Sequence, residues 1–161
     1  MLIRQVKAAD LDALVRLHAC MDAEEKVLGC VVIHPATRQF IERKLADPCT
    51  TFLVAEHFGQ IVGFAYGTFG ADVLELQNVF VVPKWRLNGL ARELLSRLFA
   101  DTPANRARAF VLKGNIYHSF WTSLGFKVVR ELVNAYEMDL DFAANSRNVR
   151  EAGRQRLRLV G

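Results

Sequence analysis

Apolar residues follow two periods along this chain of 161 residues, and each period predicts one type of element. Alternation between turn-forming residues predicts strands at residues 2–6, 50–57, 61–69, 73–82 and 107–112, with one or two more between 126 and 140. Recurrence every three to four residues predicts four helices: one from Asp10, as N-cap, to Gly29, one between Pro35 and Pro48, one after Gly89 and one over residues 116–124.

The order of these elements predicts how the strands pair. Short turns at residues 58–60 and 70–72 join three successive strands, so those strands should run antiparallel. The helix between the strands at 73–82 and 107–112 is a crossover, which makes that pair parallel. We therefore expect an α/β (α+β) fold: a mixed, mostly antiparallel central sheet of six to seven strands flanked by about four helices.

Length and composition favour one globular domain over residues 1–141, followed by a tail at 142–161. Hydrophobic residues make up 52% of the chain and charged residues 24%, which excludes global disorder. No apolar run approaches the roughly 20 residues of a membrane span, and the first residues lack the apolar stretch of an export signal. We expect a cytoplasmic protein without membrane contact, in which the three cysteines are reduced.

The net charge of +4 belongs to the tail, where five arginines and one glutamate account for all of it. Such a tail could bind nucleic acid or an acidic partner. No aromatic residue beyond Phe142 is interleaved with the arginines, so a solvated, helical tail is the better interpretation and nucleic acid is not expected as a partner. The four histidines are scattered, so no metal site is expected either.

The segment most indicative of chemistry covers residues 79–91, where an apolar strand ends at Pro83 and a loop with Arg86 and Gly89 leads into a helix. The first turn of a helix leaves backbone N–H groups without partners and carries the positive end of the dipole. Such a helix start can bind a pyrophosphate. Gly89 would let the anion approach the backbone, and Ala91 would keep the first turn narrow. An ordinary strand–loop–helix connection with a capping glycine is an equal alternative on this pattern alone.

Residues 86–91, Arg-Leu-Asn-Gly-Leu-Ala, fit the Q/R-x-x-G-x-G/A loop of the GCN5-related N-acetyltransferases. Residues 119–126 resemble the aromatic-rich helix of that family, which ends in Gly-Phe. The strand before the loop, the hairpin at 54–64 and the opening at 3–14 are also similar, so the resemblance covers roughly residues 2–140. Two motifs in the family's order, on the expected elements, imply its fold and its binding of acyl-CoA.

The resemblance implies acetyl-CoA as the cosubstrate, with no metal. It places the pyrophosphate on the loop amides of residues 87–91 and the pantetheine arm along the strand at 79–81. A splay between that strand and the strand at 107–112 would hold the thioester, and a backbone N–H near Val81 would polarise its carbonyl. The residues expected to contact the cosubstrate are Val79, Phe80, Val81, Arg86, Leu87, Asn88, Gly89, Leu90, Ala91, Asn115 and Trp121.

Acetylation needs a free amine, so a base must take a proton from the acceptor ammonium. The resemblance implies a glutamate eleven residues before the loop's first residue, which is Glu75, while a second family position nearer the loop holds Gln77, which cannot act as a base. Residues 75 and 77 share a face of a regular strand, so Glu75 could serve the same cleft. An exposed carboxylate at the start of a strand is the alternative.

The family's usual proton donor is a tyrosine four residues before the Gly-Phe, and here that position holds Trp121. An indole N–H cannot usefully protonate a thiolate, so Trp121 is expected to pack over the cosubstrate or the core. Tyr117, one helical turn earlier, is the candidate replacement, with water as the alternative.

We therefore expect an enzyme that transfers an acetyl group from acetyl-CoA directly to a primary amine of a small molecule, within a ternary complex. Residues 21–30, Asn134 and Tyr136 would line the acceptor side. One alternative is a catalytically inactive acyl-CoA-binding or regulatory module, because Gln77 and Trp121 are inert at both catalytic positions. Another is a protein-lysine acetyltransferase that docks an acidic partner through its tail. Family members often pair through their last strands, so a homodimer is one expected arrangement.

Overall fold

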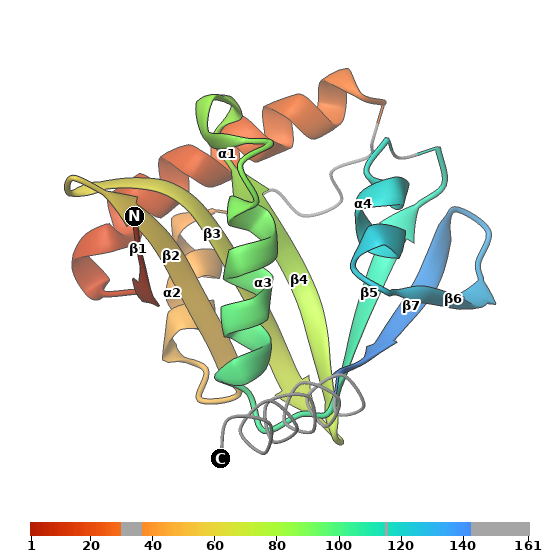
Figure 1. The fold of residues 1–161 in the computed structure, drawn as a ribbon. Helices are drawn as coiled ribbons and strands as arrows, with labels where there is room; N and C mark the ends of the chain where they lie inside the picture. The colour runs from red at the N-terminus through yellow and green to blue at the C-terminus, as the bar shows by residue number, and fades with distance from the viewer. Residues whose placement is uncertain (30–36, 115, 143–161) are drawn as a thin grey trace, which may run out of the picture.

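The computed structural model describes residues 1–29, 37–114 and 116–142, and the strands of this part form one sheet in the order β1-β2-β3-β4-β5-β7-β6 (Figure 1). The strands are β1 (Leu2–Gln5), β2 (Thr50–His57), β3 (Gln60–Gly70), β4 (Val73–Val81), β5 (Arg106–Leu112), β6 (Lys127–Glu131) and β7 (Ala135–Asp141). The helices are α1 (Leu11–Val27), α2 (Arg38–Ala46), α3 (Leu90–Ala100) and α4 (His118–Ser123), with 3-10 turns η1 (Ala8–Asp10) and η2 (Pro83–Trp85). The expected fold class is confirmed. The predicted tail beyond Phe142 lies outside the described residues.

Two-residue turns join β2 to β3 and β3 to β4, and both use left-handed backbone. Phe58 and Gly59 have φ values of 47° and 77°, and Ala71 and Asp72 have values of 46° and 69°. Two successive left-handed residues match a turn to the twist of the flanking strands. The three strands are therefore antiparallel neighbours, as the sequence predicted.

β4 and β5 run parallel, as expected for strands joined by a crossover helix, but they pair only at their first residues. Three residue pairs connect them, from Val73↔Arg106 to Glu75↔Arg108. Beyond this point β4 and β5 spread apart toward α1 and α4, respectively (Figure 1). β5 continues its pairing on the other side, against β7, and β6 forms the edge of the sheet. The two halves of the sheet therefore meet only at the start of β4.

An extra residue in β4 contributes to this divergence. Tyr66 of β3 lies opposite Asn78 and Gly67 lies opposite Leu76, so Gln77 has no partner and forms a β-bulge. A bulge bends its strand and increases the local twist. The strand is therefore not regular at Gln77, where the sequence had suggested uninterrupted alternation.

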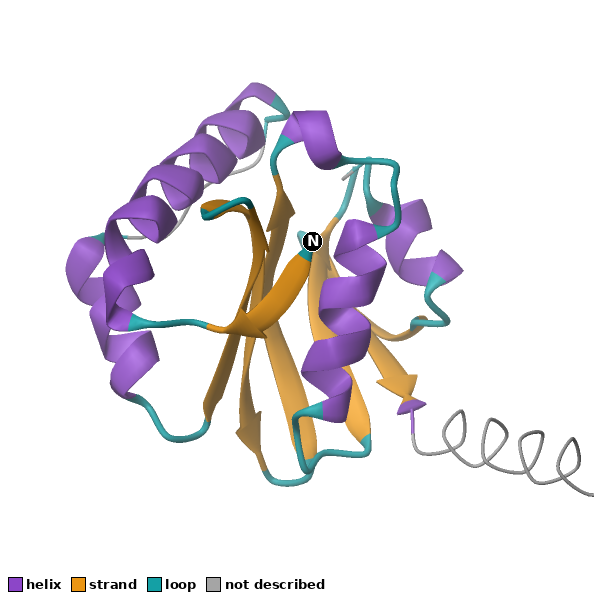
Figure 2. Ribbon diagram, turned by 60° about the vertical axis from the view of Figure 1, so that its left-hand side comes forward, coloured by secondary structure: helices purple, strands orange, loops and turns teal. Residues whose placement is uncertain are grey.

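Helices cover both faces of the sheet, and each face has its own core (Figure 2). α3 packs on one face through Leu94 and Leu98, while α1 and α2 pack on the other through Leu14 and Ile41. Phe80 of β4 belongs to the core under α1 and α2. The β4 side chains that belong to the core under α3 are Leu74, Leu76, Val79 and Val81.

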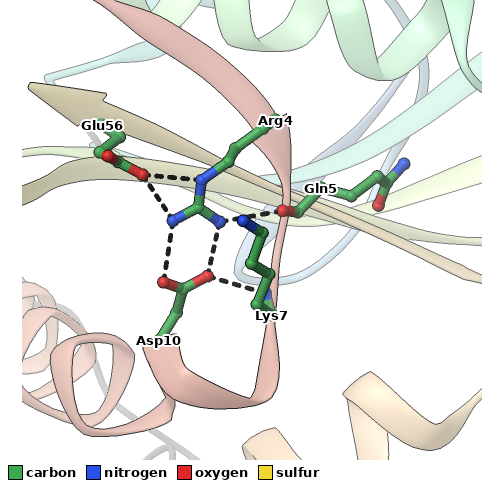
Figure 3. Close-up of polar contacts among 5 residues, drawn as sticks. All are labelled: Arg4, Gln5, Lys7, Asp10 and Glu56. Carbon is green, nitrogen blue, oxygen red and sulfur yellow. Dashed lines mark hydrogen bonds and ion pairs between the residues drawn. The ribbon is translucent and has the colours of Figure 1, made fainter. Parts of the chain in front are cut away.

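Arg4 ties β1 to β2 and to the turn before α1 (Figure 3). Its guanidinium donates to the two carboxylate oxygens of Asp10 at 2.7 and 3.0 Å and to Glu56 at 2.7 Å. The backbone N–H of Lys7 also donates to Asp10, at 2.7 Å. Asp10 precedes the first residue of α1, as expected of an N-cap, but its carboxylate makes no capping bond to α1 and instead accepts from Arg4 and from the N–H of Lys7, the residue before η1. The hydrogen bond from Arg4 is the main reason that the pKa of Asp10 lies below its ordinary value.

None of the described helices combines the length and the apolar content that a bilayer crossing requires. Within the same described ranges, no three His, Cys, Asp or Glu side chains are grouped closely enough to hold a metal ion.

Candidate functional site

A cleft of about 480 Å³ occupies the divergence of β4 and β5 and is lined from both faces of the sheet. One wall comes from the end of α1, and the opposite wall comes from the starts of α3 and α4. The lining residues that carry the argument below are Met21, Glu24, Glu25, Asn78, Val81, Arg86, Gly89, Tyr117 and Trp121. A ligand in this cleft would pass through the sheet, with one end at α3 and the other at α1.

The loop before α3 presents backbone, more than side chains, to one end of the cleft. Leu87 and Gly89 have left-handed φ values of 62° and 80°, and the side chain of Leu87 is fully exposed. α3 begins at Leu90, so the N–H groups of its first turn have no partner inside the helix. A Cβ added to Gly89 would meet nothing within 4 Å, which shows open space at this position. These are the features that an anion-binding loop needs.

The side chain of Arg86 fastens this loop to α1. Its Nε donates to the carbonyl oxygen of Val81 at 2.7 Å, and its Nη2 donates to the two carboxylate oxygens of Glu24 at 3.0 and 2.7 Å. The guanidinium also lies 5.3 Å from the ring centroid of Phe80, a cation–π contact. The sequence suggested a role for Arg86 in cosubstrate binding, and the structure shows that its guanidinium also connects the two walls of the cleft.

The middle of the cleft runs along the free edge of β4. The N–H of Val82 donates to Val62 of β3 at 3.0 Å. Adjacent residues of a strand point their N–H groups to opposite sides, so the N–H of Val81 points away from β3, toward the cleft. No ladder pair joins β4 to β5 beyond Glu75 in the part of the chain described here. This edge can accept an extended ligand as an additional strand would be accepted.

Aromatic residues form the wall on the α4 side. Trp121 packs edge-on against Phe120 and Phe126, with ring centroids 5.4 and 5.3 Å away. Tyr117 immediately precedes α4 and also lines the cleft. Trp121 therefore belongs partly to the core and, like Tyr117, also lines the cleft.

The structure brings most of the predicted contact residues to this cleft, with two exceptions. Asn88 is not among the lining residues, although its neighbours are. Asn115 lies outside the described residues. On the acceptor side, the end of α1 lines the cleft as suggested, whereas Tyr136 packs against the ring of His118 at 5.4 Å and does not line it.

Glu75, the predicted base, lies at the closed end of the splay and does not line the cleft. It is exposed and stands opposite Thr68 on β3 and Arg108 on β5. The pKa of Arg108 is raised mainly by its hydrogen bond to Asp139, and the charge of Glu75 adds to this effect. The eleven-residue spacing before the loop therefore locates a carboxylate that stands opposite Arg108 and does not line the cleft.

Sequence analysis did not single out Glu25, which lines the cleft at the end of α1. Burial, and secondarily the charge of Asp22, raise the pKa of the Glu25 carboxyl. The signal was present in the helical spacing, because Glu25 follows Leu14, His18 and Met21 on the face of α1 that packs on the sheet. That spacing shows that Glu25 faces inward, but it cannot show that a cleft lies opposite.

Residues 48–128, half of the chain, match the family model described as an acetyltransferase (GNAT) domain. Among curated proteins, no sequence matches this chain. Similar solved structures include the PaiA N-acetyltransferase from Thermoplasma acidophilum in complex with coenzyme A, with a TM-score of 0.73 and 16% identity over 87% of this chain and 98% of that one.

Two other similar structures are of enzymes that are named for different substrates or products. N-acetylglutamate synthase from Neisseria gonorrhoeae, complexed with coenzyme A and N-acetyl-glutamate, has a TM-score of 0.71 and 18% identity over 87% of this chain and 34% of that one. The ribosomal-protein-alanine N-acetyltransferase from Brucella melitensis has a TM-score of 0.67 and 26% identity over 88% of this chain and 99% of that one.

Proposed function

The chain belongs to the GNAT family of acetyltransferases, and from this premise we propose that it transfers an acetyl group from acetyl-CoA to a primary amine of a small molecule. The cleft through the splayed sheet supports this proposal, because it joins an anion-binding helix start to a separate wall on α1. Two substrates can therefore enter from opposite faces and meet beside the free edge of β4. Similar structures that contain coenzyme A support the choice of donor.

Each part of the cleft has a proposed task. The backbone of residues 87–91 would hold the pyrophosphate at the start of α3, and the free edge of β4 would align the extended arm. Acetyl-CoA supplies the activated thioester. The N–H of Val81, which points toward the cleft, would donate to the oxygen on which negative charge develops during attack.

Tyr117 is the proposed proton donor to the departing thiolate, and its position on the cleft wall supports this role. Glu75 is the base that the family spacing suggests. Since it does not line the cleft, that role would need a water chain between Glu75 and the amine.

The test combines binding and turnover on the full chain. Calorimetry should show that acetyl-CoA binds, and a thiol-release assay should show turnover with primary amines in a panel that also contains amino acids and a peptide with a free N-terminus. Turnover with the peptide alone would refute the small-molecule acceptor, and absence of acetyl-CoA binding would refute the proposal as a whole.

A binding module without activity is the second candidate, and the packing of Trp121 against Phe126 favours it. The indole fills the position of the family's acid with a side chain that is part of the core. Trp121→Tyr distinguishes the two functions: faster thiol release would show acid-step geometry in the cleft, whereas tight acetyl-CoA binding without turnover in both proteins would favour the binding module.

A further inference from the structure

The free edge of β4 ends at Val81, whose carbonyl oxygen and N–H both point toward the cleft. The N–H of the next residue, Val82, donates to Val62 of β3, and in an antiparallel pair the N–H and C=O of one residue point to the same side. Both backbone groups of Val81 therefore point away from β3. The carbonyl oxygen accepts from Nε of Arg86 at 2.7 Å, so the N–H is the group left for a ligand at this position.

The guanidinium of Arg86 is held from its other side by α1. Its Nη2 donates to the two carboxylate oxygens of Glu24 at 3.0 and 2.7 Å, and the guanidinium lies 5.3 Å from the ring centroid of Phe80. Contacts from β4, from α1 and from an aromatic ring fix a planar guanidinium in one orientation. Phe80 belongs to the core under α1 and α2, whereas α3 packs on the opposite face. The charge of Arg86 is therefore paired on the α1 side of the sheet.

This arrangement differs from that of a phosphate ligand. The guanidinium already binds a carboxylate, and the unpaired N–H groups at the start of α3 belong to the helix on the other face of the sheet. The side chains of Arg86 and Glu24 are 30% and 34% exposed, and ion pairs with such access to water contribute little to folding. What the pair does supply is order, because it ties a backbone carbonyl of the β4 edge to the end of α1.

We propose that Arg86 is a positioning residue for acetyl transfer: anchored by Glu24, its guanidinium fixes the carbonyl of Val81 and thereby aims the N–H of Val81 at the thioester oxygen. This inference rests on the proposed function and adds a side chain that acts on the reaction through the backbone. The carbonyl and the N–H of one strand residue turn together about the strand axis, so a fixed carbonyl fixes the direction of the N–H. Without the bond from Arg86, water or a ligand N–H would compete for this carbonyl, and the end of β4 would be free to twist.

Three variants separate the two polar contacts of Arg86. Arg86→Met removes both contacts. Arg86→Gln places Nε2 at the same distance along the side chain as Nε of arginine, so it keeps the bond to Val81 and loses the one to Glu24. Glu24→Gln removes the charge of the anchor. The matched control is Asp12→Asn, which removes another α1 carboxylate that pairs with an arginine, Arg38 on α2, and that does not line the cleft. Thermal unfolding should show that all four variants are folded.

The first measurement is the single-turnover rate of acetyl transfer to the primary amine that the wild type acetylates fastest. Arg86→Met should lower this rate by about tenfold or more, which is less than the roughly 10²–10³-fold cost of losing an oxyanion donor altogether. Arg86→Gln should recover most of the rate, Glu24→Gln should lose less than Arg86→Met, and Asp12→Asn should behave as wild type. Calorimetry should show the wild-type affinity for coenzyme A in all four variants, because the guanidinium does not hold the anion.

Infrared spectra of bound acetyl-CoA, isotopically labelled at the thioester carbonyl carbon, test the inference without turnover. A hydrogen bond from Val81 should give the carbonyl a lower stretching frequency in the wild type and in Arg86→Gln than in Arg86→Met. The same difference in a wild type that releases no thiol would refute the proposed acetyl transfer and still support the positioning role. An identical carbonyl band or an unchanged single-turnover rate in Arg86→Met would overturn the inference. Tighter coenzyme A binding in Glu24→Gln would also overturn it, because it would show that Arg86 is an anion ligand which Glu24 holds back.

Discussion

Gly89 and Gly59 form a natural pair for testing the loop before α3. Their φ values are 80° and 77°, and a Cβ added to either would meet nothing within 4 Å. Neither substitution by alanine therefore creates a clash, and both impose the same left-handed strain, which destabilises a non-glycine residue by about 1 kcal/mol. Gly89 lines the cleft, whereas Gly59 lies in the turn between β2 and β3 and does not.

The two variants should therefore lose similar stability and differ only in binding. For a domain of this size, a loss of about 1 kcal/mol lowers Tm by roughly 2–4 °C, and circular dichroism should show this shift in both proteins. Calorimetry with coenzyme A should show an affinity about tenfold lower for Gly89→Ala, equivalent to roughly 1.4 kcal/mol, because the added methyl group occupies space that the anion needs. Gly59→Ala should bind as wild type does.

Equal coenzyme A affinities in Gly89→Ala and wild type would refute the anion-binding role of this loop. A Tm loss far larger in Gly89→Ala than in Gly59→Ala would instead show that Gly89 has a structural role beyond its left-handed conformation. The more bulky Gly89→Trp should weaken binding further while the fold survives.

Glu75→Gln should lower turnover mainly at low pH, where free amine is scarce, if a water chain connects Glu75 to the amine, and an unchanged pH–rate profile would remove Glu75 from the mechanism. Tyr117→Phe removes only the hydroxyl, and a turnover loss of about 10²-fold is expected if it protonates the thiolate; full retention would show that the thiolate leaves without an enzyme acid. Asp10→Asn should lower the free energy of unfolding by about 2 kcal/mol at neutral pH, because it breaks charge-assisted hydrogen bonds from Arg4. The folded-state pKa of Asp10 is depressed, so this stabilisation is complete above its ordinary value of 3.8 and is lost as the pH falls through the depressed value. Urea titrations of Asp10→Asn and wild type should accordingly converge in acid, and a constant difference would contradict the ion-pair explanation.

Local signals in the sequence predicted most of the fold. The turn at Phe58-Gly59, the helix start after Gly89 and the apolar periods depend on neighbouring residues, so one sequence suffices to find them. The loop before α3 was found for the same reason, since strand, glycine and helix follow one another along the chain.

Features that depend on pairing could not be predicted. The sequence places Gln77 and Asn78 side by side, and only the register with Tyr66 shows which of them is extra. The eleven-residue spacing locates Glu75 along the chain, but the bulge and the short ladder with β5 decide whether its carboxylate faces the cleft. Glu24 and Arg86 are 62 residues apart, and no local pattern connects them.

The bulge at Gln77 also has a consequence for insertions and deletions in this chain. If Gln77 were removed, Leu76 and Asn78 would become neighbours on a regular strand, and every other β4 side chain would keep its present face. A β4 strand without Gln77 would therefore supply the same side chains to both cores. Gln77 is in this sense a single-residue insertion that the packing of the hydrophobic core does not require. Loss of this one residue would straighten the strand without exchanging a core contact. The bulge and the β4 side chains that line the cleft, Gln77 among them, would then act together on the shape of the cleft.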